Sequence, residues 1–184
     1  MTQLERLLSI YFQEVSKIQP FLIDIDSPKG IKDVLRQLNA LERRRLHSRD
    51  LYFIAFEGDL IYGFVSFNGK RDLLQETHLM VDRAYRGGLG TKLRMALFSY
   101  GKIHGHQEAI LYNVTPKAYR TFLNAVRLMA LPWETEFEVN GKIHKNVASD
   151  EYGALMERAL ESRVHCESVC RAFLRQDYKH VLQR

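Results

Sequence analysis

Residues 74–93 read LQETHLMVDRAYRGGLGTKL, and this stretch decides the fold. It is strand-like up to Val81, turns through the glycines of residues 86–90, and then opens a helix. The apolar residues of that helix recur at helical spacing: Leu93, Ala96, Leu97 and Tyr100. Glycines before a helix let an anion approach the exposed N–H groups, where the helix dipole is positive. The stretch therefore predicts a strand, a turn and a helix that can bind an anion such as a pyrophosphate.

The residues in the turn narrow the kind of anion site. Arg86 and Lys92 add positive charge. A P-loop needs Gly-Lys-Ser/Thr at the helix start, and Gly90-Thr91-Lys92 has the wrong order. A dinucleotide fold needs GxGxxG with an acid about 20 residues further on, and this turn has GGLG without that acid. From the glycines alone, a tight connection without a ligand remains the alternative.

The rest of the chain alternates helical and strand patterns around this stretch. Upstream, the patterns predict helices over residues 3–18 and 28–46 and a hairpin of strands 51–56 and 60–67. Downstream, they predict a strand at 109–114, a helix that starts at Thr115-Pro116, a hairpin of 133–139 and 142–147, and a helix from 150 to near the end. The order predicts a mixed α+β fold.

Residues 81–90 resemble the acetyl-CoA signature of the GNAT acetyltransferase superfamily, with Arg83 where that family often has Pro and a turn one residue shorter. The element order over residues 5–147 is also similar. The resemblance implies a mixed, mostly antiparallel central sheet, splayed at the cofactor site and flanked by helices. We expect a GNAT-like acyltransferase domain over residues 1–149. The remainder, 150–184, is expected to be a C-terminal helical extension that packs on the domain or on a partner subunit.

The resemblance implies an N-acetyltransferase that transfers an acetyl group from acetyl-CoA to a primary amine by direct attack. A backbone N–H near the strand end stabilises the oxyanion in such enzymes. The residues expected to bind acetyl-CoA are Met80, Val81, Arg86, Gly87, Gly88, Leu89, Gly90 and Thr91.

Two side chains on the strand are candidates for the general base. Strand alternation puts Glu76 and His78 on one face with Met80, and the family often has a Glu or His on this strand. A surface role for Glu76 and a packing role for His78 are the alternatives. For the general acid the family uses a helix Tyr, but Phe122 occupies that position here, so Tyr119 one turn earlier is the candidate. Tyr112 or solvent are other sources of the proton.

Composition restricts location and partners. The chain has 184 residues, 46% of them hydrophobic, and neither a signal peptide nor an apolar run of the roughly 20 residues that a membrane span needs. We expect a cytoplasmic protein. Cys166 and Cys170 suggest no disulfide framework or metal site. The apolar stripe of the expected C-terminal helix favours a homodimer.

The net charge of +5 fits an anionic partner, and nucleic acid is an alternative that no motif supports. Two alternatives to an N-acetyltransferase of primary amines stay open. One is a GNAT-fold binding module that is catalytically weak or inactive, and the other is an acyltransferase that acts on a nucleic acid or tRNA.

Overall fold

The computed structural model describes residues 51–57, 60–81 and 88–175. The helices predicted over residues 3–18 and 28–46 lie outside these residues, as do Arg86 and Gly87 of the turn. The chain divides into two compact units. The first consists of Met1–Asn68 and Glu76–Tyr100, and the second of Gly69–Gln75 and Gly101–Arg184. Each unit is described by itself.

The first unit contains the predicted hairpin. Strand β1 (Leu51–Glu57) pairs antiparallel with β2 (Leu60–Lys70), and the register shifts between Ala55 and Phe56. Strand β3 (Leu73–Val81) follows, and its residues from Glu76 on belong to this unit. Helix α3 (Leu89–Ile103) comes next and contributes its residues up to Tyr100. The strand and the helix predicted from residues 74–93 are therefore confirmed, whereas residues 82–87 of the predicted turn lie outside the described residues.

The core of the first unit joins the hairpin to α3. The rings of Phe53 and Phe67 stack with centroids 4.8 Å apart, and the ring of Tyr100 lies 5.1 Å from that of Phe67. Leu93, Ala96 and Leu97 are fully buried, as their spacing predicted. Burial of such side chains contributes about 1.5–3 kcal/mol each. This apolar face holds α3 against the strands.

Gly63 on β2 marks the closest approach between the elements of the first unit. A Cβ added there would lie 2.7 Å from the carbonyl oxygen of Met80 and 3.3 Å from both Val81 Cα and Leu89 Cδ2. Only a residue without a side chain fits at this point. Gly63 thus lets the end of β3 and the start of α3 meet at β2.

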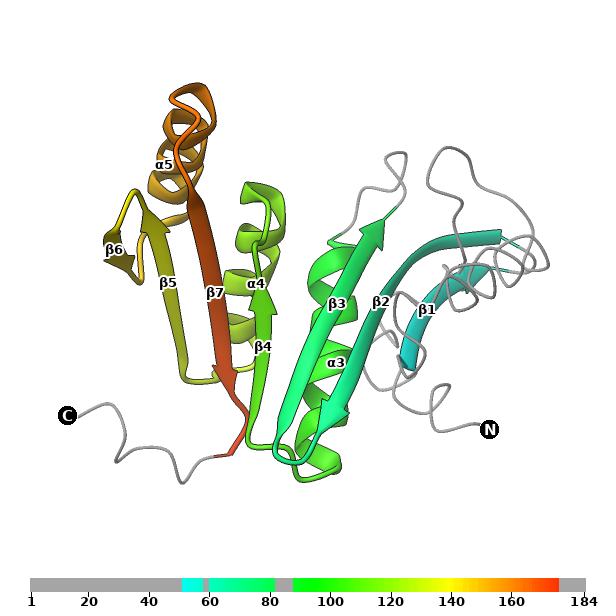
Figure 1. The fold of residues 1–184 in the computed structure, drawn as a ribbon. Helices are drawn as coiled ribbons and strands as arrows, with labels where there is room; N and C mark the ends of the chain where they lie inside the picture. Colours follow the sequence, from blue (N-terminus) through cyan, green and yellow to red (C-terminus); the bar gives the residue numbers. More distant parts are fainter. Residues whose placement is uncertain (1–50, 58–59, 82–87, 176–184) are drawn as a thin grey trace. The chain divides into compact units, whose positions relative to one another are not determined.

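The second unit is built around four further strands. They are β4 (Glu108–Tyr112), β5 (Trp133–Val139), β6 (Lys142–Lys145) and β7 (Cys166–Phe173). With the first residues of β3 they form a sheet in the order β3-β4-β7-β5-β6 (Figure 1). The β3–β4 pair is parallel, whereas the β4–β7, β7–β5 and β5–β6 pairs are antiparallel. The predicted mixed, mostly antiparallel α+β fold is confirmed.

The C-terminal helical extension predicted from residue 150 is wrong. Helix α5 covers only Ser149–Glu161, and the chain then returns as β7 between β4 and β5. The strand is paired at both edges, and Ser168, Cys170 and Ala172 are buried because successive side chains point to opposite faces of the sheet. The apolar residues that suggested a homodimer therefore lie within the sheet. Cys166 and Cys170, expected on a helix, lie on this strand as free thiols.

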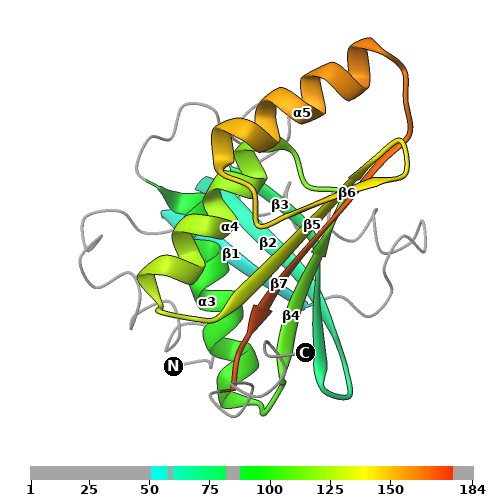
Figure 2. The ribbon, with the colours of Figure 1, turned by 90° about the vertical axis from the view of Figure 1, so that its left-hand side faces the viewer.

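Helix α4 (Pro116–Leu128) starts where it was predicted. The Thr115 hydroxyl caps it by accepting a hydrogen bond from Ala118 N, and Pro116 occupies the first turn. Figure 2 shows α4 along one face of the strands of the second unit. The rings of Tyr119 on α4 and Tyr152 on α5 stack 4.1 Å apart, which joins the two helices. Among the described helices, none has the length and hydropathy of a membrane span.

Candidate functional site

The start of α3 has the properties of an anion site. Gly88 is exposed with φ +70°, and a Cβ added to it would meet no atom of the described residues within 4 Å. The first hydrogen bond along the helix runs from Lys92 N to Gly88 O at 3.1 Å. The N–H groups of Leu89, Gly90 and Thr91 therefore precede the ladder of the helix. An anion can approach them from the open side of Gly88.

The predicted cofactor residues are brought together as far as the structure describes them. Met80 and Val81 are half-buried at the end of β3, whereas Leu89, Gly90 and Thr91 are buried in the first turn of α3. A Cβ added to Gly63 would lie within 3.3 Å of atoms of Met80, Val81 and Leu89, so the strand end and the helix start are neighbours. Arg86 and Gly87 lie outside the described residues, so their predicted role stays a prediction.

The ladder between β3 and β4 is short. It pairs Leu73, Leu74 and Gln75 with Glu108, Ala109 and Ile110, and no further pair of the two strands is formed in the residues that the structure describes. Strand β3 nevertheless continues to Val81. Residues 76–81 of β3 belong to the first unit and are not part of this ladder.

Glu76 is part of an ion pair. Its carboxylate accepts two hydrogen bonds from Arg94 on α3, from Nε at 2.8 Å and from Nη2 at 2.6 Å. Only 7% of the Glu76 side chain and none of that of Arg94 is exposed. This is the bidentate geometry that guanidinium and carboxylate groups prefer. Both carboxylate oxygens of Glu76 are therefore engaged with a cation.

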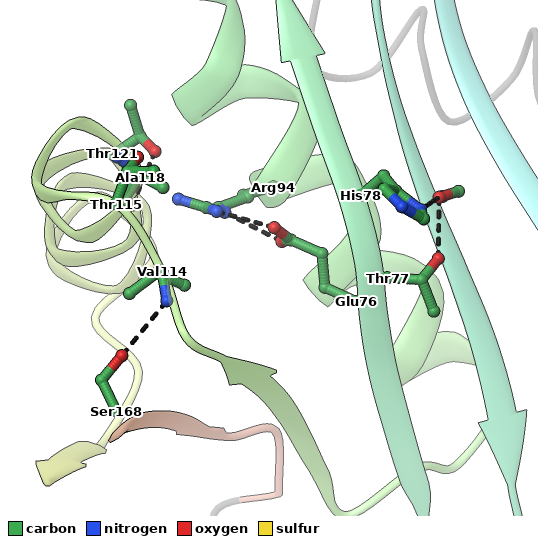
Figure 3. A network of polar contacts seen from close by, with 10 residues as sticks. Glu76, Thr77, His78, Arg94, Val114, Thr115, Ala118, Thr121 and Ser168 are labelled. Atoms are coloured by element: carbon green, nitrogen blue, oxygen red, sulfur yellow. Dashed lines mark hydrogen bonds and ion pairs between the residues drawn. The ribbon is translucent and has the colours of Figure 1, made fainter. Parts of the chain in front are cut away.

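His78 lies in a different environment. Its Nδ1 is 3.4 Å from the Ser66 hydroxyl on β2, and that hydroxyl is 2.7 Å from the Thr77 hydroxyl. Figure 3 shows Glu76 and His78 pointing to opposite sides of β3, so the expectation that they share one face is wrong. The reason is local: the neighbours Thr77 and His78 both reach Ser66, which strict alternation does not allow. The His78 side chain is exposed.

Tyr119 lies in the core of the second unit with 1% exposure. Its hydroxyl donates a hydrogen bond to the carbonyl oxygen of Val147 at 2.8 Å and lies 2.9 Å from the hydroxyl of Thr135. Burial raises the pKa of Tyr119 above the ordinary value of tyrosine. These contacts are those of a packing residue, and they lend no support to the acid role predicted for Tyr119.

Sequence reasoning missed Arg94 and Ser66. Arg94 falls on the buried stripe of α3 together with Gly90, Leu93 and Leu97. A charged residue on an apolar helical stripe is a signal, because a buried guanidinium needs an acidic partner. For Ser66 the sequence has no comparable signal, since serine is common on strands that face solvent.

Solved structures of acetyltransferases share this fold. The ribosomal-protein-S18-alanine N-acetyltransferase from Escherichia coli matches with a TM-score of 0.50 and 14% identity, over 77% of this chain and 79% of that chain. The acetyltransferase from Bacillus subtilis in complex with CoA matches with a TM-score of 0.45 and 13% identity, over 73% and 81%. The Salmonella typhimurium protein yncA, with its cofactor acetyl-CoA, matches with a TM-score of 0.48 and 15% identity, over 78% and 75%.

The chain therefore has the fold of the GNAT acetyltransferases. No protein-family model and no curated protein matches the sequence.

Proposed function

We propose that the protein is an N-acetyltransferase that transfers the acetyl group of acetyl-CoA to a primary amine. The observation that carries the proposal is the start of α3: Gly88, with no atom of the described residues near its Cβ position, precedes three helix amides on a GNAT fold. Residues 89–92 contain no acid that would repel a phosphate, and Lys92 adds a positive charge. These properties fit the pyrophosphate of CoA.

We propose that the thioester end of acetyl-CoA lies beside the end of β3. Met80 and Val81 are next to the first turn of α3 through Gly63, so a molecule bound by its pyrophosphate at Gly88–Thr91 can extend along this strand. A backbone N–H at the strand end can donate to the thioester oxygen and stabilise the negative charge that develops there. Arg86 and Gly87 complete the predicted set of binding residues.

The chemical step needs no covalent enzyme intermediate. The amine nitrogen attacks the thioester carbonyl carbon, a C–N bond forms, the C–S bond breaks, and CoA leaves as thiolate. We propose His78 as the acceptor of the amine proton, because it is an imidazole on β3 that is exposed to solvent, and its Nδ1 lies 3.4 Å from the Ser66 hydroxyl. Solvent supplies the proton of the thiolate, since the Tyr119 hydroxyl is engaged in the core.

Two measurements on the full chain test the proposal. Isothermal titration calorimetry measures the dissociation constant of acetyl-CoA, and a free-thiol assay measures CoA release with a mixed panel of amines, proteins and tRNA. We expect micromolar binding and amine-dependent thiol release. Binding without thiol release for any acceptor would instead favour a CoA-binding module. Failure to bind any CoA ester would refute the proposed function.

A further inference from the structure

The ion pair of Glu76 and Arg94 connects the two elements on either side of the glycine turn. Glu76 lies four residues before Met80 on β3, and Arg94 lies five residues after Leu89 on α3. With strand and helix rises of about 3.3 and 1.5 Å per residue, the pair lies about 13 Å along the strand and about 7.5 Å along the helix from the predicted cofactor residues. It does not overlap the binding residues themselves.

A second contact between these elements is made at Gly63, at the other end. There atoms of Met80 and Val81 on β3 and of Leu89 on α3 all lie within 3.3 Å of the position that a Cβ of residue 63 would take. These two contacts add to the buried apolar face that holds α3 against the strands. The ion pair also fixes rotation about the helix axis, because a planar guanidinium bonded through Nε and Nη2 has one orientation.

The burial of the pair makes a purely stabilising role a weak explanation. Replacing a buried ion pair with apolar residues of similar volume is often neutral or stabilising, and in some proteins a buried polar group instead specifies one arrangement of the chain. Neither partner can leave the pair without stranding a buried charge. The arrangement of β3 and α3 is thus specified by the geometry of the fork.

We propose that Arg94 is a positioning residue: through Glu76 it sets β3 against α3 so that the strand end at Met80 and the first turn at Gly88–Thr91 are aligned for acetyl-CoA. The inference rests on the proposed function. It also gives Glu76 a structural role as the partner of Arg94, in place of the predicted role as the general base that accepts the amine proton. Neither residue touches the reacting atoms in this assignment.

The first test replaces Arg94 by Lys, which keeps the charge and loses the fork. We expect the melting temperature to fall by only about 5 °C, while the dissociation constant of CoA rises roughly tenfold or more. The matched control is Arg120→Lys, at an exposed ion pair with Asp150 at 3.6 Å, which should leave both values unchanged. If Arg94→Lys binds CoA as wild type does, the fork has no positioning role and the proposal is wrong.

The second test separates positioning from stability and from base catalysis. Replacing both partners, Arg94→Met with Glu76→Leu, should restore the melting temperature but not the affinity for CoA. Recovery of both would overturn the proposal. Glu76→Gln should weaken CoA binding as Arg94→Lys does. A loss of kcat in Glu76→Gln with unchanged CoA affinity would identify Glu76 as the base and also overturn it.

A third readout does not depend on CoA. The amide of Lys92, bonded to Gly88 O, should exchange its hydrogen several-fold faster in Arg94→Lys than in wild type because the first turn of α3 is less well held. If wild type binds no CoA, the proposed function fails, and this exchange rate still tests the positioning of α3. Unchanged exchange at Lys92 in Arg94→Lys contradicts the positioning role.

Discussion

Gly63 on β2 faces the carbonyl oxygen of Met80 on β3 so closely that a Cβ at residue 63 would lie 2.7 Å from that oxygen. A real side chain there must displace backbone. Since Val81 Cα and Leu89 Cδ2 would each lie 3.3 Å from that Cβ, the displacement reaches both the strand end and the helix start. The glycine therefore controls the geometry of the predicted binding site without taking part in binding.

Gly63→Ala should destabilise the protein by about 1–3 kcal/mol through overpacking and weaken acetyl-CoA binding. Urea denaturation and calorimetry measure the two effects. Gly153→Ala in α5 is the control. The added Cβ would lie 3.9 Å from Pro116 Cβ, which is an ordinary contact, and alanine stabilises a helix by about 1 kcal/mol relative to glycine. If Gly63→Ala retains both wild-type stability and wild-type CoA affinity, the close approach at Met80 is not a constraint.

A negative charge at Gly88 should weaken CoA binding. Gly88→Glu places a carboxylate where the pyrophosphate is proposed to lie, whereas Gly88→Gln has nearly the same size without charge. Both variants bear the same cost of a positive φ, about 1–2 kcal/mol. We expect the dissociation constant of CoA to be roughly tenfold or more higher in Gly88→Glu than in Gly88→Gln. Equal affinities in calorimetry would place the pyrophosphate elsewhere.

Removing the Tyr119 hydroxyl should affect stability and not catalysis. Tyr119→Phe loses the hydrogen bond to Val147 O and leaves that carbonyl without this donor, at a cost of about 1–3 kcal/mol. Because the hydroxyl lies within the core of the second unit, kcat in the thiol assay should stay within about twofold of wild type. A large loss of kcat at unchanged stability would restore the general-acid role to Tyr119.

Stability should decline at high pH because of Tyr152. Its hydroxyl donates to Val114 O at 2.6 Å, and burial raises its pKa to about 12. The unfolded chain releases this proton near pH 10, so the stabilisation is complete below pH 10 and is lost as pH rises toward 12. The full loss amounts to about 3 kcal/mol. Urea denaturation at pH 9 and pH 11 should show a smaller decline in Tyr152→Phe than in wild type.

The strand and the helix within residues 74–93 could be predicted because their signals are local. Leu93, Ala96 and Leu97 repeat at the helical period, and each is buried. The ion pair of Arg94 could be predicted only in part. The helical period places Arg94 on the buried stripe, but its partner Glu76 lies 18 residues away and is identified only once β3 and α3 pack together.

The end of α5 could not be predicted for a different reason. The helix ends at Glu161 with Ser162 as its C-cap, and Arg163 takes a positive φ of 53° where a glycine would have signalled the stop. The strand character of Cys166–Phe173 then depends on β4 and β5, which lie on either side of it. Residues 169, 170, 173 and 174 fit a helical stripe equally well, so tertiary pairing decides between the two structures.

The position of β7 has a consequence for biosynthesis. It is the last described strand to leave the ribosome, yet it lies between β4 and β5, which are made much earlier. Until it arrives, the nascent second unit presents two strand edges with open hydrogen-bonding groups. Chaperone protection during translation should therefore matter most in the interval between synthesis of β5 and release of Phe173.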